Sequence, residues 1–235
     1  MGNSPRNTFT MPGGGSEEVK KMINRLRILI ADDHNLVAEL CRRLLETEFD
    51  VVGVVSDGRA LLRAAVELKP DVIVLDIAMP VLNGLDAGRQ VKQALPSVKL
   101  VYLTMNTDIE VAAKAFESGA SGYLLKTCAA AEMAVAVREV SKCKSYICKG
   151  LSRDAIDCLR WQHKKLVEEH ERLTDRQREV LQLLAEGKVM KEVGGILNMS
   201  TRTVAFHKYR MMEVLGAKSN AELIKYAIRN HMVAA

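Results

Sequence analysis

The sequence predicts an α/β domain built on a doubly wound parallel sheet, followed by a smaller all-α domain. Three observations support this fold class. Five short apolar runs alternate with five amphipathic segments in the N-terminal part of the chain, which is the pattern of repeated βα units. Four of these runs lead directly into polar residues. The C-terminal part contains helical patterns without apolar strand-like runs.

The predicted strands are apolar runs bounded by turn residues or charges. They span Leu26–Ala31, Val51–Val55, Val72–Leu75, Lys99–Leu103 and Gly122–Leu125. The segments between them carry apolar residues at helical spacing and end at Pro, Gly or charged residues. The corresponding helices are predicted over Asn35–Glu48, Asp57–Leu68, Gly84–Leu95, Asp108–Ser118 and Ala129–Lys142.

The chain divides into four parts by composition. Residues 1–24 are rich in Gly and polar residues and are predicted to be a disordered N-terminal extension. Residues 25–145 form the α/β domain. Residues 146–171 carry scattered apolar residues among many charges and are predicted to be a linker helix. Residues 172–235 form the helical domain.

The helical domain is predicted to contain four short helices. Thr174 and Gln177 form a capping box at the first helix, and Gly187 ends it. Lys188–Leu197 and a helix from the Ser200 cap to Leu215 are separated by a tight turn, and a fourth helix follows Ser219. Two short helices across a tight turn, the second rich in polar and basic residues, are typical of helix-turn-helix DNA-binding domains.

Charge, cysteine content and the length of the apolar runs indicate the compartment in which the protein works. From Glu171 to the end there are eleven Lys or Arg against seven Asp or Glu, so this part of the chain is basic. The five cysteines lack the spacing of metal ligands and are predicted to be reduced thiols. No apolar run is long enough to cross a membrane. We therefore expect a cytoplasmic protein with no membrane partner.

Polar residues with useful chemistry follow four of the predicted strands. Asp32 and Asp33, Asp76, Thr104 and Lys126 all stand at carboxyl ends of strands, which share one edge of a doubly wound sheet. Three converging carboxylates repel one another, and Mg²⁺ would relieve this repulsion while leaving positions for phosphate oxygens. Lys126 offers a positive charge and Thr104 a hydroxyl group. The set predicts phosphoryl transfer to the carboxylate of Asp76.

The N-terminal residues resemble the response-regulator receiver domain of bacterial two-component systems. The resemblance is carried by Asp32-Asp33, the D-x-x-M-P motif of Asp76–Pro80, Thr104 and the Gly119–Lys126 block. It implies the CheY-like (βα)5 fold and a sensor histidine kinase, or a small acyl phosphate, as the phosphoryl donor. It also implies that the protein is a phosphoryl acceptor and not an enzyme.

The C-terminal residues resemble the tetrahelical DNA-binding domain of NarL/LuxR-type (NarL/FixJ) regulators. The matching residues are Leu173-Thr174, Arg176–Leu181, Gly187, Lys191–Val193, Ser200, Thr203-Val204, His207 and Leu215–Ala217. With the receiver match, the resemblance covers about Arg25 to Met232. It implies transcription regulation, with double-stranded promoter DNA as partner, RNA polymerase as a candidate partner, and a homodimer as the active form on two half-sites.

The receiver resemblance also assigns roles at the site. Asp33 would bind Mg²⁺ directly and Asp32 through water, and the backbone carbonyl of Ala78 would complete the protein ligands with Asp76. Lys126 would bind the phosphoryl group, Thr104 would move to hydrogen-bond it, and Tyr123 would swing inward as a switch. The surface altered by phosphorylation would span about Asp108 to Lys142.

The DNA-binding resemblance places the DNA contacts on the third helix and the preceding turn. Before phosphorylation the receiver would cover this recognition helix, and the last helix, about Ala221–Asn230, would pair DNA-bound domains. Phe206 either touches a thymine methyl group or packs against the neighbouring helix. The residues expected at DNA are Lys188, Thr201, Arg202, Ala205, Phe206, His207, Lys208, Tyr209 and Arg210.

Three residues depart from the receiver pattern or stand beside it. Thr127 follows Lys126 where many receivers have a proline in a cis bond, so the geometry of this peptide bond is left open. Met105 is larger than the Ala or Gly common beside Thr104, and the hypothesis is that it restricts access to the phosphoryl group. His34, next to the acidic pair, is predicted to be a structural or edge residue.

Two other functions compete with this interpretation. The first is a hydrolase with an Asp nucleophile, which usually needs a second Asp two residues on as acid and base; here that position is Ala78. The second is a DNA-binding protein with a relic receiver that is no longer phosphorylated. The complete set of Asp32, Asp33, Asp76, Thr104 and Lys126 argues against the relic.

Overall fold

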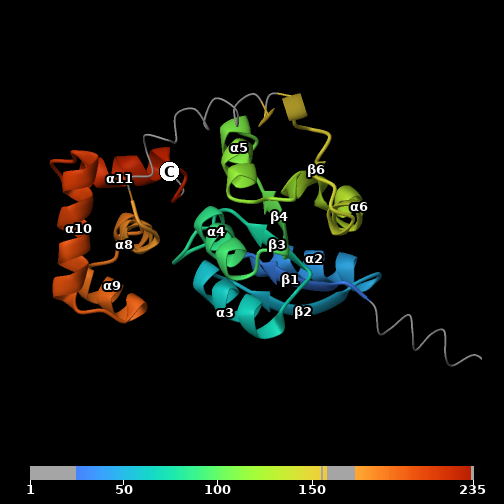
Figure 1. The fold of residues 1–235 in the computed structure, drawn as a ribbon, viewed down its shortest axis with the longest axis horizontal. Helices are drawn as coiled ribbons and strands as arrows, with labels where there is room; N and C mark the ends of the chain where they lie inside the picture. The colour runs from blue at the N-terminus through green and yellow to red at the C-terminus, as the bar shows by residue number, and fades with distance from the viewer. Residues whose placement is uncertain (1–24, 155, 158–172, 234–235) are drawn as a thin grey trace, which may run out of the picture.

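Two separate apolar cores organise the part of the chain that the structure describes. The computed structural model describes residues 25–154, 156–157 and 173–233 (Figure 1). One core gathers buried residues from Ile28 to Ile156 around a sheet, and the other gathers residues from Val180 to Met232 between helices. The predicted N-terminal extension lies outside the described residues.

The first core is a six-stranded parallel sheet with strand order β2-β1-β3-β4-β5-β6. Every residue of β3 is buried, so helices must cover both faces of the sheet. The predicted doubly wound fold is therefore confirmed. The strands are β1 (Arg27–Ala31), β2 (Asp50–Val55), β3 (Val72–Asp76), β4 (Lys99–Thr104), β5 (Gly122–Leu125) and β6 (Tyr146–Ile147).

Three helices of this domain begin directly after a residue whose side chain caps them. Asp57, Asn83 and Asp108 each accept a hydrogen bond from a backbone N–H of the first turn that follows. Helix α2 packs with α6, and α3 packs with α4. The helices are α2 (Asn35–Glu46), α3 (Gly58–Leu68), α4 (Gly84–Ala94), α5 (Ile109–Glu117) and α6 (Ala129–Ser141), with the 3₁₀ helix η1 (Lys126–Cys128) before α6.

The prediction of a linker helix from residue 146 is wrong at its start. Tyr146 and Ile147 form β6 beside β5, and Cys148 and Ile156 are buried in the core of the sheet domain. The α/β domain therefore extends beyond residue 145. A strand of two residues carries too little periodicity to be recognised in sequence. Residues 158–172 of the predicted linker helix lie outside the described residues.

The second core is formed by four helices, as predicted. They are α8 (Asp175–Ala185), α9 (Met190–Leu197), α10 (Thr201–Leu215) and α11 (Asn220–Arg229). Both sides of the capping box between Thr174 and Gln177 are present. The side chain of Ser219 caps α11 by accepting a hydrogen bond from the N–H of Glu222. The carboxylate of Glu222 accepts a hydrogen bond from the N–H of Lys218, the residue before the cap.

Helix α8 of the helical domain lies against the sheet domain (Figure 1). Helix α10 lies on the far side of α8 from the sheet (Figure 1), and its Phe206 and Tyr209 are exposed. The expectation that the sheet domain covers α10 is therefore wrong for the described residues. The docked face is that of α8, together with residues that follow α11.

Candidate functional site

The polar residues predicted at the strand ends lie together in the structure. Asp32 and Asp33 follow β1, Asp76 ends β3, Thr104 ends β4, and Lys126 begins η1 directly after β5. The register of the parallel strands pairs Asp76 with Leu103 and Thr104 with Leu125. Because neighbouring strands end at the same level, residues far apart in sequence meet at one edge of the sheet.

Lys126 connects two of the carboxylates. Its Nζ lies 2.8 Å from Oδ2 of Asp76 and 2.8 Å from Oδ2 of Asp32. Both aspartates are buried. Burial of Lys126 disfavours its charge, but the hydrogen bonds and charges of Asp32 and Asp76 outweigh this and raise its pKa. Lys126 is therefore a fixed positive charge beside the predicted phosphoacceptor.

The acidic residues of the site fit a hard divalent cation. Potential ligand atoms of Asp32, Asp33, His34 and Asp76 all lie within 4.8 Å of one another. Lys126 supplies one positive charge against three carboxylates, so the group attracts a further cation, and carboxylate oxygens are ligands that Mg²⁺ prefers. Ala78 is exposed and lines the same cavity as Asp33, which is consistent with a ligand role for its carbonyl group.

Thr104 and Tyr123 meet at the backbone of Asn106. The N–H of Asn106 donates to Oγ1 of Thr104 (3.1 Å), and the hydroxyl of Tyr123 donates to the carbonyl oxygen of Asn106 (3.2 Å). The Tyr123 side chain is fully buried, and burial raises its pKa. Tyr123 already points inward in this structure, so the predicted inward swing does not start from this conformation. Its role as a switch stays a prediction.

The three residues that depart from the receiver pattern or stand beside it are His34, Met105 and Thr127. His34 is exposed, and its Nδ1 lies 2.8 Å from Oδ1 of Asp33, which agrees with the prediction of an edge residue. The Met105 side chain is 67% exposed, and the residues of this segment that line the cavity are its neighbours Thr104 and Asn106. The Lys126–Thr127 peptide bond is not cis. The hypothesis that Met105 restricts access stays a prediction.

Residues after Asp76 fix its position in ways that the sequence did not reveal. Oδ1 of Asp76 accepts from the N–H of Ile77 (2.7 Å). The N–H of Gly84 donates to the carbonyl oxygen of Ile77 (2.8 Å), and a Cβ at Gly84 would lie 2.0 Å from the carbonyl oxygen of Asp76. The first turn of α4 therefore rests on the backbone of Asp76. A glycine after a helix cap was the only sequence signal for this contact.

Helix α10 presents a mixed basic and aromatic face to solvent. Val204 and Met211 point into the helical core, and the opposite face carries exposed Arg202, Phe206 and Tyr209. Phe206 is 65% exposed, so the alternative that it packs against a neighbouring helix is wrong. Basic residues on such a face contact phosphates, and an aromatic ring can touch a thymine methyl group.

The remaining predicted DNA contacts differ in accessibility. Thr201, Arg210 and Lys188 are exposed, whereas Ala205, His207 and Lys208 are partly buried. Arg210 forms an ion pair with Glu213 (2.6 Å). Exposed Thr203, which was not predicted to contact DNA, shares a hydrogen bond with the cap residue Ser200.

The turn between α9 and α10 yields a prediction with an internal control. A Cβ at Gly194 would lie 2.6 Å from the carbonyl oxygen of Met199, whereas a Cβ at Gly195 meets nothing within 4 Å. We expect Gly194→Ala to destabilise the helical domain by about 1–3 kcal/mol and to weaken binding to duplex DNA. Gly195→Ala should stabilise it by about 0.5–1 kcal/mol. Thermal unfolding measures the stability of each variant, and fluorescence anisotropy with labelled duplex DNA measures its binding. Equal effects of the two substitutions on stability would contradict this prediction.

The family follows from comparison with known proteins. Residues 28–138 match the response regulator receiver domain, and residues 171–227 match the luxR family of bacterial regulatory proteins. The chain is 37% identical over 210 residues to the transcriptional regulatory protein LiaR of Bacillus subtilis, a match that covers 88% of this chain and 99% of LiaR. The chain belongs to the response regulators with a LuxR-type DNA-binding domain.

Other response regulators match over similar lengths. The response regulator protein VraR of Staphylococcus aureus is 30% identical over 210 residues, covering 88% of this chain and 99% of VraR. A structure of the response regulator RcsB of Salmonella typhimurium aligns with a TM-score of 0.56 and 26% identity, covering 89% of this chain and all of RcsB. The sheet domain is thus the receiver domain and the helical domain is the DNA-binding domain of a transcriptional response regulator. The described residues contain no helix long and apolar enough to cross a membrane.

Proposed function

We propose that phosphorylation of Asp76 controls binding of promoter DNA by this response regulator. The single observation that carries the proposal is the position of Asp76: its buried carboxylate lies 2.8 Å from Nζ of Lys126, within a cluster of acidic groups at the edge of the sheet. This arrangement supplies an acceptor, a cation for the transferred group and oxygen ligands for a metal ion.

The chemistry follows from these residues. A carboxylate oxygen of Asp76 attacks phosphorus, and the P–N bond of a phosphohistidine, or the P–O bond of an acyl phosphate, breaks. The bonding electrons leave with the imidazole or the carboxylate of the donor. Asp32, Asp33, Asp76 and the Ala78 carbonyl would hold Mg²⁺, which neutralises charge on the phosphoryl oxygens when bound. Lys126 binds one of these oxygens, and Thr104 is placed to donate to another.

Structures of a relative support two of the proposed partners, DNA and a second copy of the chain. A structure of RcsB from Salmonella enterica serovar Typhimurium, 26% identical with a TM-score of 0.54, is bound to promoter rprA in the presence of phosphomimetic BeF3-. Another contains two RcsB dimers bound to two parallel DNAs. By analogy with these structures we propose a homodimer on two DNA half-sites as the active form. From the receiver-domain match we propose a sensor histidine kinase as donor, and we propose RNA polymerase as a further partner. The protein acts as a phosphoryl acceptor rather than as an enzyme.

The test is to weigh the intact protein after incubation with acetyl phosphate and Mg²⁺. Wild type is expected to gain one phosphoryl group, and Asp76→Asn is expected to gain none because the amide is not a nucleophile for phosphorus. Asp50→Asn, at an exposed position of β2, is the matched control and should behave as wild type.

Two results would overturn the proposal. A wild-type protein that gains no phosphoryl group would indicate a relic receiver. Sustained turnover of a phosphate ester, rather than a single adduct, would indicate a hydrolase.

A further inference from the structure

The DNA-binding domain contains a cavity of its own, with a volume of about 270 Å³. Its walls come from all four helices of the domain and from the turn between α8 and α9. Leu181 and Leu223 are buried at this cavity, whereas Val189 and Ile224 at its walls are 62% and 37% exposed. Because apolar side chains of the wall remain exposed, a ligand can reach the cavity from solvent, which is not true of a void in a packed core.

The polar side chains at this cavity are basic or neutral. Lys188, Lys208 and Asn220 line it, and no lining residue is acidic. Lys188 is exposed, and Nζ of Lys208 lies 5.7 Å from the centre of the Tyr209 ring. Neither lysine forms an ion pair with another described residue. Both ammonium groups are therefore available to an anion.

Three glutamates of this domain have partners outside the cavity. The carboxylate of Glu192 accepts from the N–H of Val189 (2.8 Å), and that of Glu222 accepts from the N–H of Lys218 (2.7 Å). Glu213 forms an ion pair with an arginine of α10. None of these glutamates lines the cavity, so an anion that enters it meets no carboxylate at the wall.

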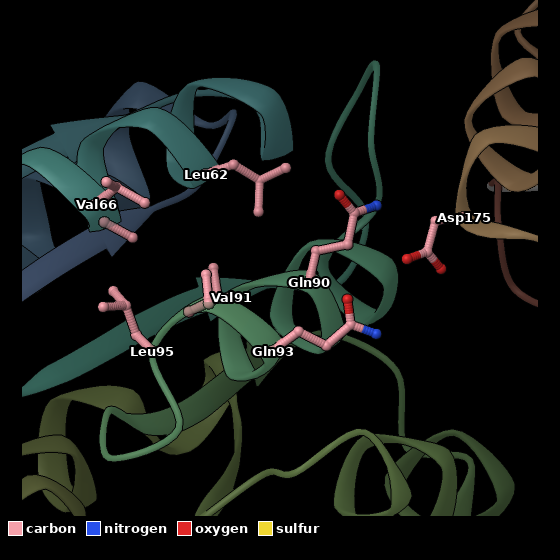
Figure 2. A pocket seen from close by; sticks show the side chains of 9 residues that line it. Leu62, Val66, Gln90, Val91, Gln93, Leu95 and Asp175 are labelled. Carbon is pink, nitrogen blue, oxygen red and sulfur yellow. The ribbon is translucent and has the colours of Figure 1, made fainter.

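A larger groove on the receiver domain provides a contrast. The groove between α3 and α4 has a volume of about 450 Å³ and apolar walls that include Leu62 and Val91 (Figure 2). Its polar side chains are Gln90, Gln93 and Asp175 (Figure 2), and no lining residue is basic. This groove offers an anion no charged partner. The cavity of the DNA-binding domain, in contrast, combines apolar walls with two positive charges.

We propose that this cavity binds a small amphipathic carboxylate, of the class of medium-chain fatty acids, and that the bound ligand competes with DNA. The apolar walls take the hydrocarbon chain. The ammonium groups of Lys188 and Lys208, which are compact point charges, take the carboxylate. The volume is just below the about 300–1,000 Å³ of usual ligand sites, so it leaves no room for the two chains of a phospholipid.

Competition follows because both lysines are also among the residues expected at DNA. A lysine that neutralises a phosphate contributes to DNA affinity by releasing counterions. A carboxylate held between Lys188 and Lys208 removes this contribution. The inference thus rests on the proposed binding of DNA and names a ligand that regulates it. Asp76 takes no part in the competition, so the ligand acts equally on the phosphorylated and the unphosphorylated chain.

Calorimetric titration of the full chain tests the two halves of the ligand separately. Octanoate should bind about 16-fold more tightly than hexanoate, because each of its two additional buried methylene groups contributes about fourfold in Kd. 1-Octanol has the same chain without the charge and should bind at least about fivefold more weakly than octanoate. Octylammonium has the opposite charge and should not bind.

Substitutions at the cavity locate the bound ligand. Lys208→Met should weaken binding of octanoate about fivefold, the upper value for an ion pair at an exposed position. Lys225→Met is the matched control, because Lys225 is an exposed lysine of α11 that does not line the cavity. Val189→Glu places a carboxylate at the wall and should abolish binding, whereas Val189→Gln, of the same length without the charge, should retain most of it. Thermal unfolding of each variant verifies that the domain is folded.

Fluorescence anisotropy with a labelled duplex of mixed sequence measures the competition. With octanoate at about ten times its own Kd, the Kd of wild type for DNA should rise about tenfold. The Kd of Val189→Glu for DNA should not respond to octanoate, and sodium acetate at the same concentration controls for salt.

The inference is overturned if octanoate does not bind, if octylammonium or 1-octanol binds as tightly as octanoate, or if Lys208→Met and Lys225→Met bind octanoate equally. It is also overturned if bound octanoate leaves the affinity for DNA unchanged. A wild-type protein that fails to bind duplex DNA in the absence of octanoate would instead overturn the proposed function.

Discussion

Replacing Lys126 by Met is expected to slow phosphorylation of Asp76 by acetyl phosphate by about 10²–10³-fold, which is the usual effect of removing one charge-stabilising donor from a reaction centre. Lys126 touches both Asp32 and Asp76 at 2.8 Å, so its ammonium group is placed to bind the transferred phosphoryl oxygen. Met has a similar length without the charge. The rate of adduct formation, followed by the mass of the intact protein, measures the effect.

The same variant is expected to bind Mg²⁺ more tightly than wild type. In wild type the ammonium group of Lys126 competes with a metal ion for the oxygens of Asp32 and Asp76, and in the variant three carboxylates converge without it. Calorimetric titration with Mg²⁺ measures this change. Lys142→Met, which loses only an exposed contact with Glu139, is the matched control. Unchanged Mg²⁺ affinity together with an unchanged phosphorylation rate would show that Lys126 does not serve the site.

Replacing Gly84 by Ala is expected to lower the free energy of unfolding by about 3 kcal/mol, the upper part of the range for overpacking. The added Cβ would lie 2.0 Å from the carbonyl oxygen of Asp76 and 2.9 Å from the Cα atom of Ile77. Both are backbone atoms, so neither can move away without shifting β3 or α4. Denaturant unfolding measures the loss, and phosphorylation of the variant should also slow because Asp76 is displaced.

Gly150→Ala is the control for this change in the same domain. A Cβ at Gly150 would lie 3.6 Å from Cδ1 of Leu125, an ordinary van der Waals contact, so its effect on stability should be small. A Gly84→Ala variant as stable as wild type and phosphorylated at the same rate would show that α4 does not hold the phosphoacceptor in place.

The phosphorylation site was predictable because the topology of the sheet brings its residues together. Once five apolar runs alternate with helices, the parallel sheet brings the ends of β1, β3, β4 and β5 to one edge. Asp76, Thr104 and Lys126 stand at those ends, and no knowledge of side-chain packing is needed to place them together. The same reasoning failed for β6, because two residues in a strand leave no periodic pattern.

The orientation of α10 side chains was only partly predictable. Helical periodicity places Val204 and Met211 on one face, but it does not say how far a neighbouring helix covers the flanks. Phe206 is apolar and was equally compatible with packing or with exposure. The packing of α8 and α9 against α10 leaves Phe206 65% exposed.

The sequence by itself determined the two domains, the acidic and basic groups of the phosphorylation site, and the helix that carries the DNA contacts. These features depend on local periodicity, capping and the geometry of parallel strands, which are encoded within short segments. Only the tertiary structure decided that Gln182 of α8 and Glu186, the residue that follows this helix, hold the loop after Asp76. Such a contact depends on two folded surfaces matching in shape and charge, and residues about a hundred positions apart carry no local signal of it.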